Sequence, residues 1–253
     1  MKFFTIVFLL LLSSLVPTLG QGTLARATDS PGVATPGVAA PGTQAALALY
    51  DSATVESQHL YNGLQYYIYD SPFEEHQFFR TEDWEIGSVF YDGQLFQGVP
   101  LLYDIVKDQL VARYKQGFGN VALQSPKVGY FTLTGHTFVR VEADTGRVEG
   151  LRTGFYDQLY TGKTKVVARR AKERQQDLSD RRVVIKFPQK DVFYLYKMGE
   201  YHPVRTRKSV LSYLEDQKKP LKKYLRDHNL TFRDDREAAI RGLAAHYDEL
   251  TNP

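Results

Sequence analysis

The feature that most constrains the fold is a stretch from Ile86 to Val141 in which apolar and polar residues alternate. Short turn-forming sequences, among them Asp92-Gly93 and Thr134-Gly135, interrupt the alternation. A strand places successive side chains on opposite faces of a sheet, so this pattern predicts strands with one buried face. An Asp-Gly pair between such runs is typical of a two-residue hairpin turn, because both turn positions need a positive φ. The stretch therefore predicts successive antiparallel strands joined by short turns.

The same alternation resumes at Gly154 and continues to Thr206. A further hairpin is predicted near the start of the folded region, with strands at 55–61 and 64–69 around Asn62-Gly63. The 17 Tyr and 15 Phe residues favour strands, because aromatic rings pack well on a pleated surface. Together these segments predict a mostly antiparallel sheet of about ten strands, curled into a barrel-like or sandwich form.

The periodicity changes to a helical one in the last part of the chain. Ser209 can cap a short helix, Pro220 fits the first turn of a second, and Asp234 or Asp235 can cap a third. The third helix carries an apolar stripe at helical spacing, which consists of Ile240, Leu243, Ala244 and Tyr247. An amphipathic helix must bury its apolar side, and the sheet is the obvious surface. We therefore predict an α+β fold with a C-terminal helical segment, residues 207–253, packed on a β-rich domain, residues 47–206.

The N-terminal residues 1–20 have the pattern of a secretory signal peptide. Lys2 precedes an apolar run from Phe3 to Leu15, and Thr18-Leu19-Gly20 supplies small residues at the predicted cleavage site. A permanent membrane anchor needs about 20 apolar residues, so this run is short for the alternative of an uncleaved anchor. We expect export to the periplasm, the outer membrane or the medium, cleavage after Gly20, and no transmembrane segment after cleavage.

Residues 21–46 are predicted to be a disordered linker. Pro31, Pro36 and Pro41 are each followed by Gly within a segment rich in small residues. Such a segment cannot bury enough apolar surface to offset the entropy lost on ordering. It is therefore expected to act as a flexible tether.

Composition narrows the classes of function. The 32 basic and 29 acidic residues nearly cancel to a net charge of +3, so no strong field for nucleic acid is predicted. The chain has 0 Cys, which excludes thiol catalysis, thiolate metal sites and lipid attachment through a cysteine. The six His lack the spacing of a metal motif, and no nucleophile elbow of a serine hydrolase occurs. No catalytic residue, cofactor or metal is therefore predicted.

Two features near residue 165 allow a functional interpretation. Lys163, Lys165 and Arg169 share one face of a predicted strand, where they could bind an acidic partner such as lipid phosphate, lipopolysaccharide or an acidic glycan. The alternative is an edge strand whose charges prevent pairing with other chains, and the pattern favours this alternative. Thr161 to Thr164 reads TGKT like the end of a phosphate-binding loop, but Asp157 stands where that motif needs Gly, so a hairpin turn is favoured.

Three phrases of the sequence carry a family resemblance: GSVFYDGQLFQGVPLLYDIVKDQLV, GFYDQLYTGKTKVVARR, and YHPVRTRKSVLSYL with KKPLKKYLRDHNLTF. With these phrases the chain resembles uncharacterised secreted proteins of the Bacteroidota, over nearly all of its length after the linker. The resemblance implies an exported protein of the cell envelope with no assigned activity. It supplies no functional residues.

The sequence therefore predicts an exported cell-envelope protein that acts as a non-enzymatic binding or structural module. Its partner is unknown, with an acidic envelope component as one candidate. Two alternatives remain open: a carrier of a lipid or other apolar ligand inside a curved sheet, and a hydrolase without a recognisable motif. An enclosed apolar cavity would favour the carrier, and a cleft that brings a His and carboxylates together would favour the hydrolase.

Overall fold

The structure is a computed structural model that describes residues 59–69, 75–114, 119–143, 150–178 and 183–251. These residues all belong to one compact unit, residues 49–253. The predicted signal peptide and linker lie outside the described residues.

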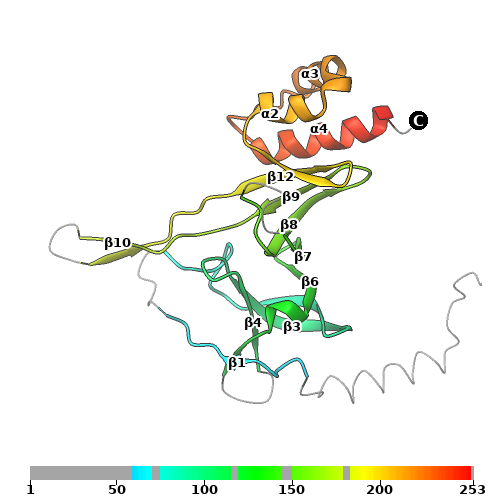
Figure 1. The fold of residues 1–253 in the computed structure, drawn as a ribbon. Coiled ribbons are helices and arrows are strands. Elements are labelled where there is room, and N and C mark those ends of the chain that lie inside the picture. The colour runs from blue at the N-terminus through cyan, green and yellow to red at the C-terminus, as the bar shows by residue number, and fades with distance from the viewer. Residues whose placement is uncertain (1–58, 70–74, 115–118, 144–149, 179–182, 252–253) are drawn as a thin grey trace, which may run out of the picture. The chain divides into compact units, whose positions relative to one another are not determined.

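An 11-stranded antiparallel sheet forms the main element, with the strand order β1-β5-β4-β3-β2-β6-β7-β8-β9-β12-β13 (Figure 1). Its strands are β1 (Leu64–Gln65), β2 (Glu85–Tyr91), β3 (Gln94–Asp104), β4 (Gln109–Arg113), β5 (Asn120–Ala122), β6 (Val128–Leu133), β7 (His136–Val141), β8 (Gly154–Thr161), β9 (Lys165–Arg169), β12 (Val192–Lys197) and β13 (Glu200–Val204). A 3₁₀ turn, η1 (Ser125–Lys127), precedes β6. A separate two-stranded sheet pairs β10 (Gln175–Asp177) with β11 (Val184–Lys186).

The predicted α+β fold with a mostly antiparallel sheet is confirmed, but the sheet is not a barrel. A barrel requires its first and last strands to pair with each other. In the described residues the end strands are β1 and β13, and each pairs on one side only, with β5 and β12 respectively. The sheet is therefore open.

Turn chemistry accounts for several of the hairpins. Asp92 and Gly93 have φ values of 51° and 84°, the positive pair that a two-residue hairpin turn needs. The predicted hairpin around Asn62-Gly63 is wrong in the described residues: β1 pairs with β5, and residues 55–58 lie outside them. Gly63 instead allows the close approach of β5, because a Cβ at this position would collide with the carbonyl oxygen of Ala122.

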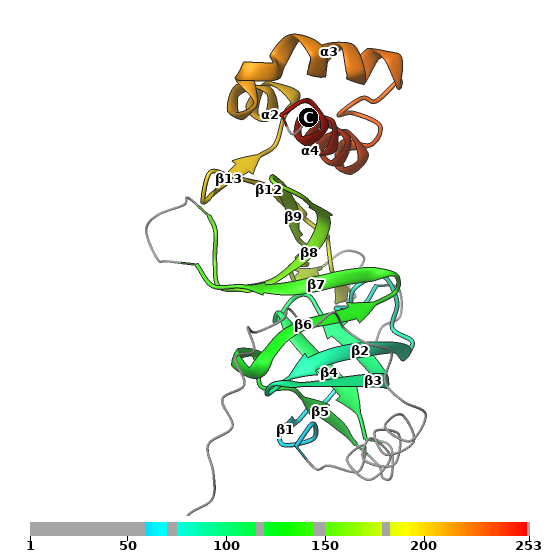
Figure 2. The same cartoon turned by 90° about the vertical axis from the view of Figure 1, so that its right-hand side faces the viewer.

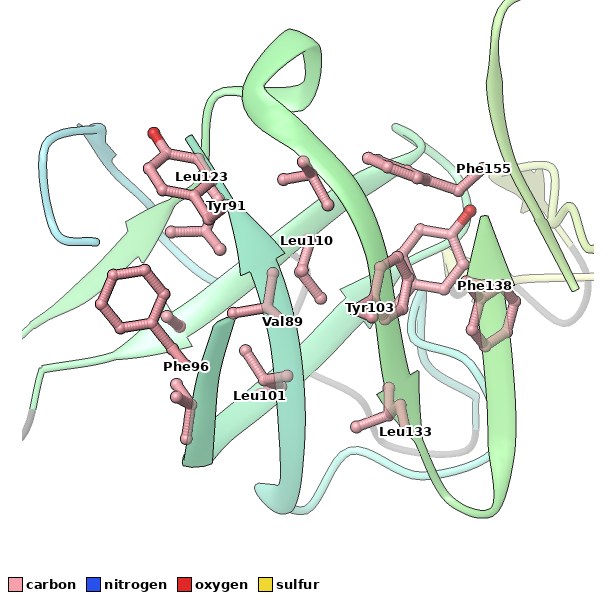
Figure 3. Packing of buried hydrophobic residues seen from close by; sticks show 14 of the residues in the cluster. Val89, Tyr91, Phe96, Leu101, Tyr103, Leu110, Leu123, Leu133, Phe138 and Phe155 are labelled. Carbon is pink, nitrogen blue, oxygen red and sulfur yellow. The ribbon is translucent and has the colours of Figure 1, made fainter. Parts of the chain in front are cut away.

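One face of the sheet, here called the inner face, carries two apolar cores. The first lies on β2 to β8 and is rich in aromatic rings, several of which meet edge-on as Figure 3 shows for Tyr103 and Phe138, with ring centroids 4.9 Å apart. The second lies on β8, β9, β12 and β13, where Val166 and Ala168 of β9 point toward the helices. The opposite face is called the outer face, and on β9 it carries Lys165, Val167 and Arg169.

The C-terminal segment forms α2 (Arg207–Tyr213), a 3₁₀ turn η2 (Glu215–Gln217), α3 (Lys218–Asp227) and α4 (Arg236–Thr251). Thr206, not Ser209, is the N-cap of α2, and Ser209 at the third helical position completes a capping box. Asp235 accepts a hydrogen bond from the backbone N–H of Ala238 at 2.8 Å, as the prediction of a cap there requires.

The three helices cover the inner face of the last part of the sheet (Figure 2). Ile240, Leu243 and Ala244 of α4 are each 0% exposed and pack with the second core. The predicted packing of the apolar stripe on the sheet is confirmed. The three helices thus all lie on the inner side of the sheet. The outer face of β9, β12 and β13 is on the opposite side from them.

Candidate functional site

Two of the three predicted cations, Lys165 and Arg169, lie on the outer face. Lys165 and Arg169 are half-buried on β9, and Lys163 is exposed in the turn that precedes it. Strand β9 pairs with β8 on one side and with β12 on the other. The favoured interpretation of these cations as guards of an edge strand is therefore wrong, because β9 has no free edge.

The edge at this end of the sheet belongs to β13. The two-residue turn at Met198-Gly199 makes Lys197 and Glu200 a hydrogen-bonded pair, so the backbone groups of Tyr201 and Pro203 point away from β12. Pro203 has no N–H to offer to another strand. Pro203 thus protects the edge strand β13 from pairing with other chains, a role that the sequence analysis had assigned to the cations of β9.

Tyrosine rings surround the cations on the outer face. Tyr196 of β12 lies opposite both Lys165 of β9 and Tyr201 of β13. The ammonium of Lys165 is 5.2 Å from the centroid of the Tyr196 ring, and the Tyr196 and Tyr201 centroids are 5.0 Å apart. This cation–π contact holds the Lys165 stem along the sheet surface with its charge at the solvent side. Burial raises the pKa of Tyr201, which keeps its hydroxyl neutral and able to donate.

Arg169 lies at the other end of β9 and has neighbours of its own. Its charge lowers the pKa of Asp108, although burial of that carboxyl dominates and the net shift is upward. Asp108 also accepts hydrogen bonds from the Tyr103 hydroxyl at 2.5 Å and from the Phe155 N–H at 3.3 Å. The charge of Arg169 also lowers the pKa of Tyr156, although burial of that hydroxyl dominates and the net shift is upward. The guanidinium is thus positioned by neighbours on the outer face and the adjacent turn.

Charge is segregated between the two faces in seven strands of the sheet, whereas β3 carries the buried carboxylate of Asp104 on its outer face. In β2, β6, β7, β8, β9, β12 and β13, which the structure describes in full, the carboxylates are Glu85, Asp157 and Glu200. All three lie on the inner face, because they stand opposite Leu101, Ala168 and Lys197 in the strand register. The outer face of these strands offers cations, hydroxyls and aromatic rings without a competing strand carboxylate. It is therefore the face suited to an anionic ligand.

A buried ion network occupies the inner face between the two apolar cores. Arg170 donates to Asp157 from Nε at 2.9 Å and from an Nη at 2.6 Å, and it also contacts Asp191 and Glu237, each at 2.6 Å. His136 Nδ1 lies 2.8 Å from the same Asp157 oxygen. Burial alone would lower the pKa of Arg170, but its hydrogen bonds to Glu237 and Asp157 outweigh burial and raise it. The network joins α4, through Glu237, to β7, β8 and β9.

This network brings a His and carboxylates together, which is the arrangement named above for a hydrolase. However, the Asp157 oxygen that contacts His136 also accepts two hydrogen bonds from a guanidinium. A carboxylate neutralised in this way is a poor base. Its other oxygen, Oδ1, is buried without a partner among the described residues. We therefore interpret this network as a structural one, which connects α4 to the sheet.

The TGKT turn has a structural partner in place of a phosphate. The Thr164 N–H donates to both carboxylate oxygens of Asp248 on α4, at 2.9 and 3.1 Å, and the Tyr160 hydroxyl donates to one of them at 3.1 Å. A Cβ at Gly162 would collide with the same carboxylate. A backbone N–H already held by a carboxylate is not available to phosphate, so the prediction of a hairpin turn is confirmed.

Among the residues that the structure describes, no group of three or more His, Asp or Glu side chains could hold a metal ion. Two surface pockets are open to solvent. One, of about 480 Å³, is lined by His59, Tyr61, Asn62 and Tyr114. The other, of about 570 Å³, lies where β12 and β13 meet α2 and α4, and its polar lining includes Lys197, Glu200 and Glu215. Neither pocket includes the cations of β9.

No protein-family model, curated protein or solved structure matches the chain. In the described part of the chain, no helix is both long and apolar enough to cross a membrane. The resemblance to secreted proteins of the Bacteroidota thus stays a prediction.

Sequence reasoning found Lys163, Lys165 and Arg169 but missed the aromatic residues beside them. Tyr194 and Tyr196 alternate with apolar residues on β12, so a signal for their shared face was present. What the sequence lacked was the register that places Tyr196 opposite Lys165. Without the register, the sequence does not reveal which residues lie beside the cations.

Proposed function

We propose that this chain is an exported protein of the cell envelope that binds an acidic envelope component on the outer face of its sheet. The observation that carries the proposal is the pair of cations Lys165 and Arg169 on the outer face of β9, with Lys163 in the preceding turn, where β8, β9, β12 and β13 carry no outer-face carboxylate. Export rests on the signal-peptide pattern of residues 1–20 and stays a prediction from sequence.

The geometry supports recognition more than nonspecific attraction. Lys165 and Arg169 are half-buried beside Tyr196 and Tyr156, so their charges are held in place and partly shielded from water. A hydrogen bond from a cation to an anion is stronger than a neutral one, and a guanidinium can contact a carboxylate or phosphate with two N–H groups. Non-enzymatic binding is the function that this surface supports best.

The test compares two variants that each remove the same charge. The first replaces Lys163, Lys165 and Arg169 with Gln. The control replaces three exposed lysines of α3, Lys218, Lys219 and Lys222, with Gln and so has the same net charge. Both are assayed for binding to immobilised heparin and to vesicles containing phosphatidylglycerol, at low and high salt, with thermal melts to check folding.

The outer-face variant should lose about a hundredfold in affinity at low salt, since each of the three cations near an anionic surface contributes about 1 kcal/mol. The loss should shrink at high salt, because salt screens exposed charges over about 8 Å. The α3 variant should bind like the wild type. Equal losses in both variants would mean that only net charge matters, and the proposal would be wrong.

A further inference from the structure

The larger of the two surface pockets lies on the inner side of the sheet, where the hairpin of β12 and β13 meets α2, η2 and α4. Its volume of about 570 Å³ is in the range of pockets that hold a small organic molecule. The residues that line it come from all of these elements, so the chain must be folded for the pocket to exist. Its chemistry differs from that of the outer face.

The pocket already holds one ammonium group, which belongs to Lys197 of β12. Its Nζ donates to the backbone carbonyl of Tyr213 at 2.9 Å and to Asp216 at 3.1 Å. The same Nζ lies 4.7 Å from the centroid of the Tyr247 ring. Burial alone would lower the pKa of Lys197, but its contacts with Tyr247 and Asp216 outweigh burial and raise it. The pocket thus binds an ammonium ion with a carbonyl, a carboxylate and a ring face.

Two further carboxylates, those of Glu200 and Glu215, line the same pocket. Asp216 is paired with Lys197, so it does not compensate them. In the described part of the chain, neither Glu200 nor Glu215 has an ion pair or a side-chain hydrogen bond. The lining therefore has two negative charges without a cation, although the whole chain has a net charge of +3.

A pair of stacked rings forms a wall of the pocket. His202 of β13 and Tyr213 of α2 both line it, with ring centroids 4.3 Å apart and planes inclined by 21°. Both side chains are half-buried, and their contact connects the hairpin to the helix. Met198, which is 90% exposed, adds an apolar group to the lining. Ring faces attract a cation and also provide a surface on which methylene groups can pack.

This combination of groups suits an organic cation better than other classes of ligand. An anion would be repelled by the carboxylates, and an apolar ligand would remove them from water without a partner, which is unfavourable. A hard divalent metal ion needs several oxygen ligands around it. Among the residues that the structure describes, no group of three or more His, Asp or Glu side chains could provide such a site. An organic cation can use the carboxylates and the ring faces together.

We propose that this pocket binds a small alkyl diamine, whose two ammonium groups pair with Glu200 and Glu215 and whose carbon chain packs on the rings of His202 and Tyr213. Two positive charges in the ligand match the two carboxylates that have no cation. The pocket does not include the cations of β9 and has the opposite charge, so this inference is independent of the proposed function.

The test uses titration calorimetry at low salt with four probes: 1,5-diaminopentane, pentylamine, 1,5-pentanediol and calcium chloride. The first three share a five-carbon chain and differ in the number of ammonium groups. The pocket variant combines Glu200→Gln with Glu215→Gln. The matched control combines Glu82→Gln with Asp83→Asn, which removes the same charge from two exposed residues outside the pocket. Thermal melts check that both variants are folded.

The diamine should bind the wild type about fivefold more tightly than pentylamine, as expected for one additional exposed ion pair. Neither 1,5-pentanediol nor calcium chloride should show saturable binding. The pocket variant should lose about tenfold in affinity for the diamine, because it removes both carboxylate partners. The control variant should bind the diamine like the wild type.

Four results would contradict the inference. Equal losses in the pocket variant and its control would assign the binding to net charge. Binding of calcium chloride in place of the diamine would make the pocket a metal site, and equal affinity for the diamine and 1,5-pentanediol would mean that charge is irrelevant. Absence of binding to all four probes would also overturn the proposal. None of these results bears on the outer face, whose cations lie outside this pocket.

Discussion

Replacing Arg170 tests whether the buried ion network joins the two apolar cores. Arg170 is 7% exposed and contacts three carboxylates, of which Asp157 has a side chain only 1% exposed. Asp191 and Glu237 are 23% and 31% exposed, so they can rehydrate when the guanidinium is lost. The cost of Arg170→Gln therefore comes mainly from the charge left on Asp157. Removing one partner of a buried ion pair costs about 3–5 kcal/mol, and we expect a loss in that range at neutral pH.

Urea unfolding at neutral pH provides the assay. In the Arg170→Gln variant, the negative charge of Asp157 stays buried without its guanidinium, and this uncompensated charge is the source of the expected loss. A double variant that adds Asp157→Asn removes the stranded charge and should recover a large part of the loss. A single variant within about 1 kcal/mol of the wild type would refute this reasoning.

Three further predictions concern the helices, a half-buried histidine and export. Leu243→Ala should cost about 2–5 kcal/mol in urea melts, because Leu243 is 0% exposed, and Leu243→Asp should cost more; wild-type stability for the Asp variant would mean that α4 is not packed. Burial, and then the charge of Lys172, lower the pKa of His76 below 6.5, so the stability it contributes is complete above that value and is lost as the pH falls. His76→Asn keeps an acceptor for the Phe78 N–H and should make stability less pH-dependent below 6.5, whereas identical pH profiles would exclude His76 as a cause. Cleavage after Gly20 should appear in the intact mass of protein recovered from the envelope, and a chain that starts at Met1 would contradict it.

Local chemistry in the sequence predicted the elements that depend on local contacts. The Asp92-Gly93 hairpin and the Asp235 cap involve residues within a few positions of each other, so the sequence contains everything that they need. The Asn62-Gly63 hairpin failed because the partner of β1 is β5, which is distant in sequence. The close approach of Ala122 explains the glycine there, and no local pattern could have revealed it.

The same distinction applies to the candidate site. The two-residue period correctly placed Lys165 and Arg169 on one face of a strand. The edge interpretation failed because the chain leaves the main sheet for the β10–β11 hairpin and then returns to pair β12 with β9. Strand order of that kind depends on tertiary packing. The charge segregation becomes visible only once the order and register of the strands are known.

The central claim is that an acidic ligand lies on the outer face of β9, and lysine footprinting tests it most directly. Acetylation of the folded protein with and without a heparin hexasaccharide, read by mass spectrometry, reports which ammonium groups the ligand covers. Protection should be strong at Lys163 and Lys165 and absent at Lys218 and Lys219, which lie in the helical segment. Protection of the α3 lysines with full reactivity at Lys163 and Lys165 would contradict the claim.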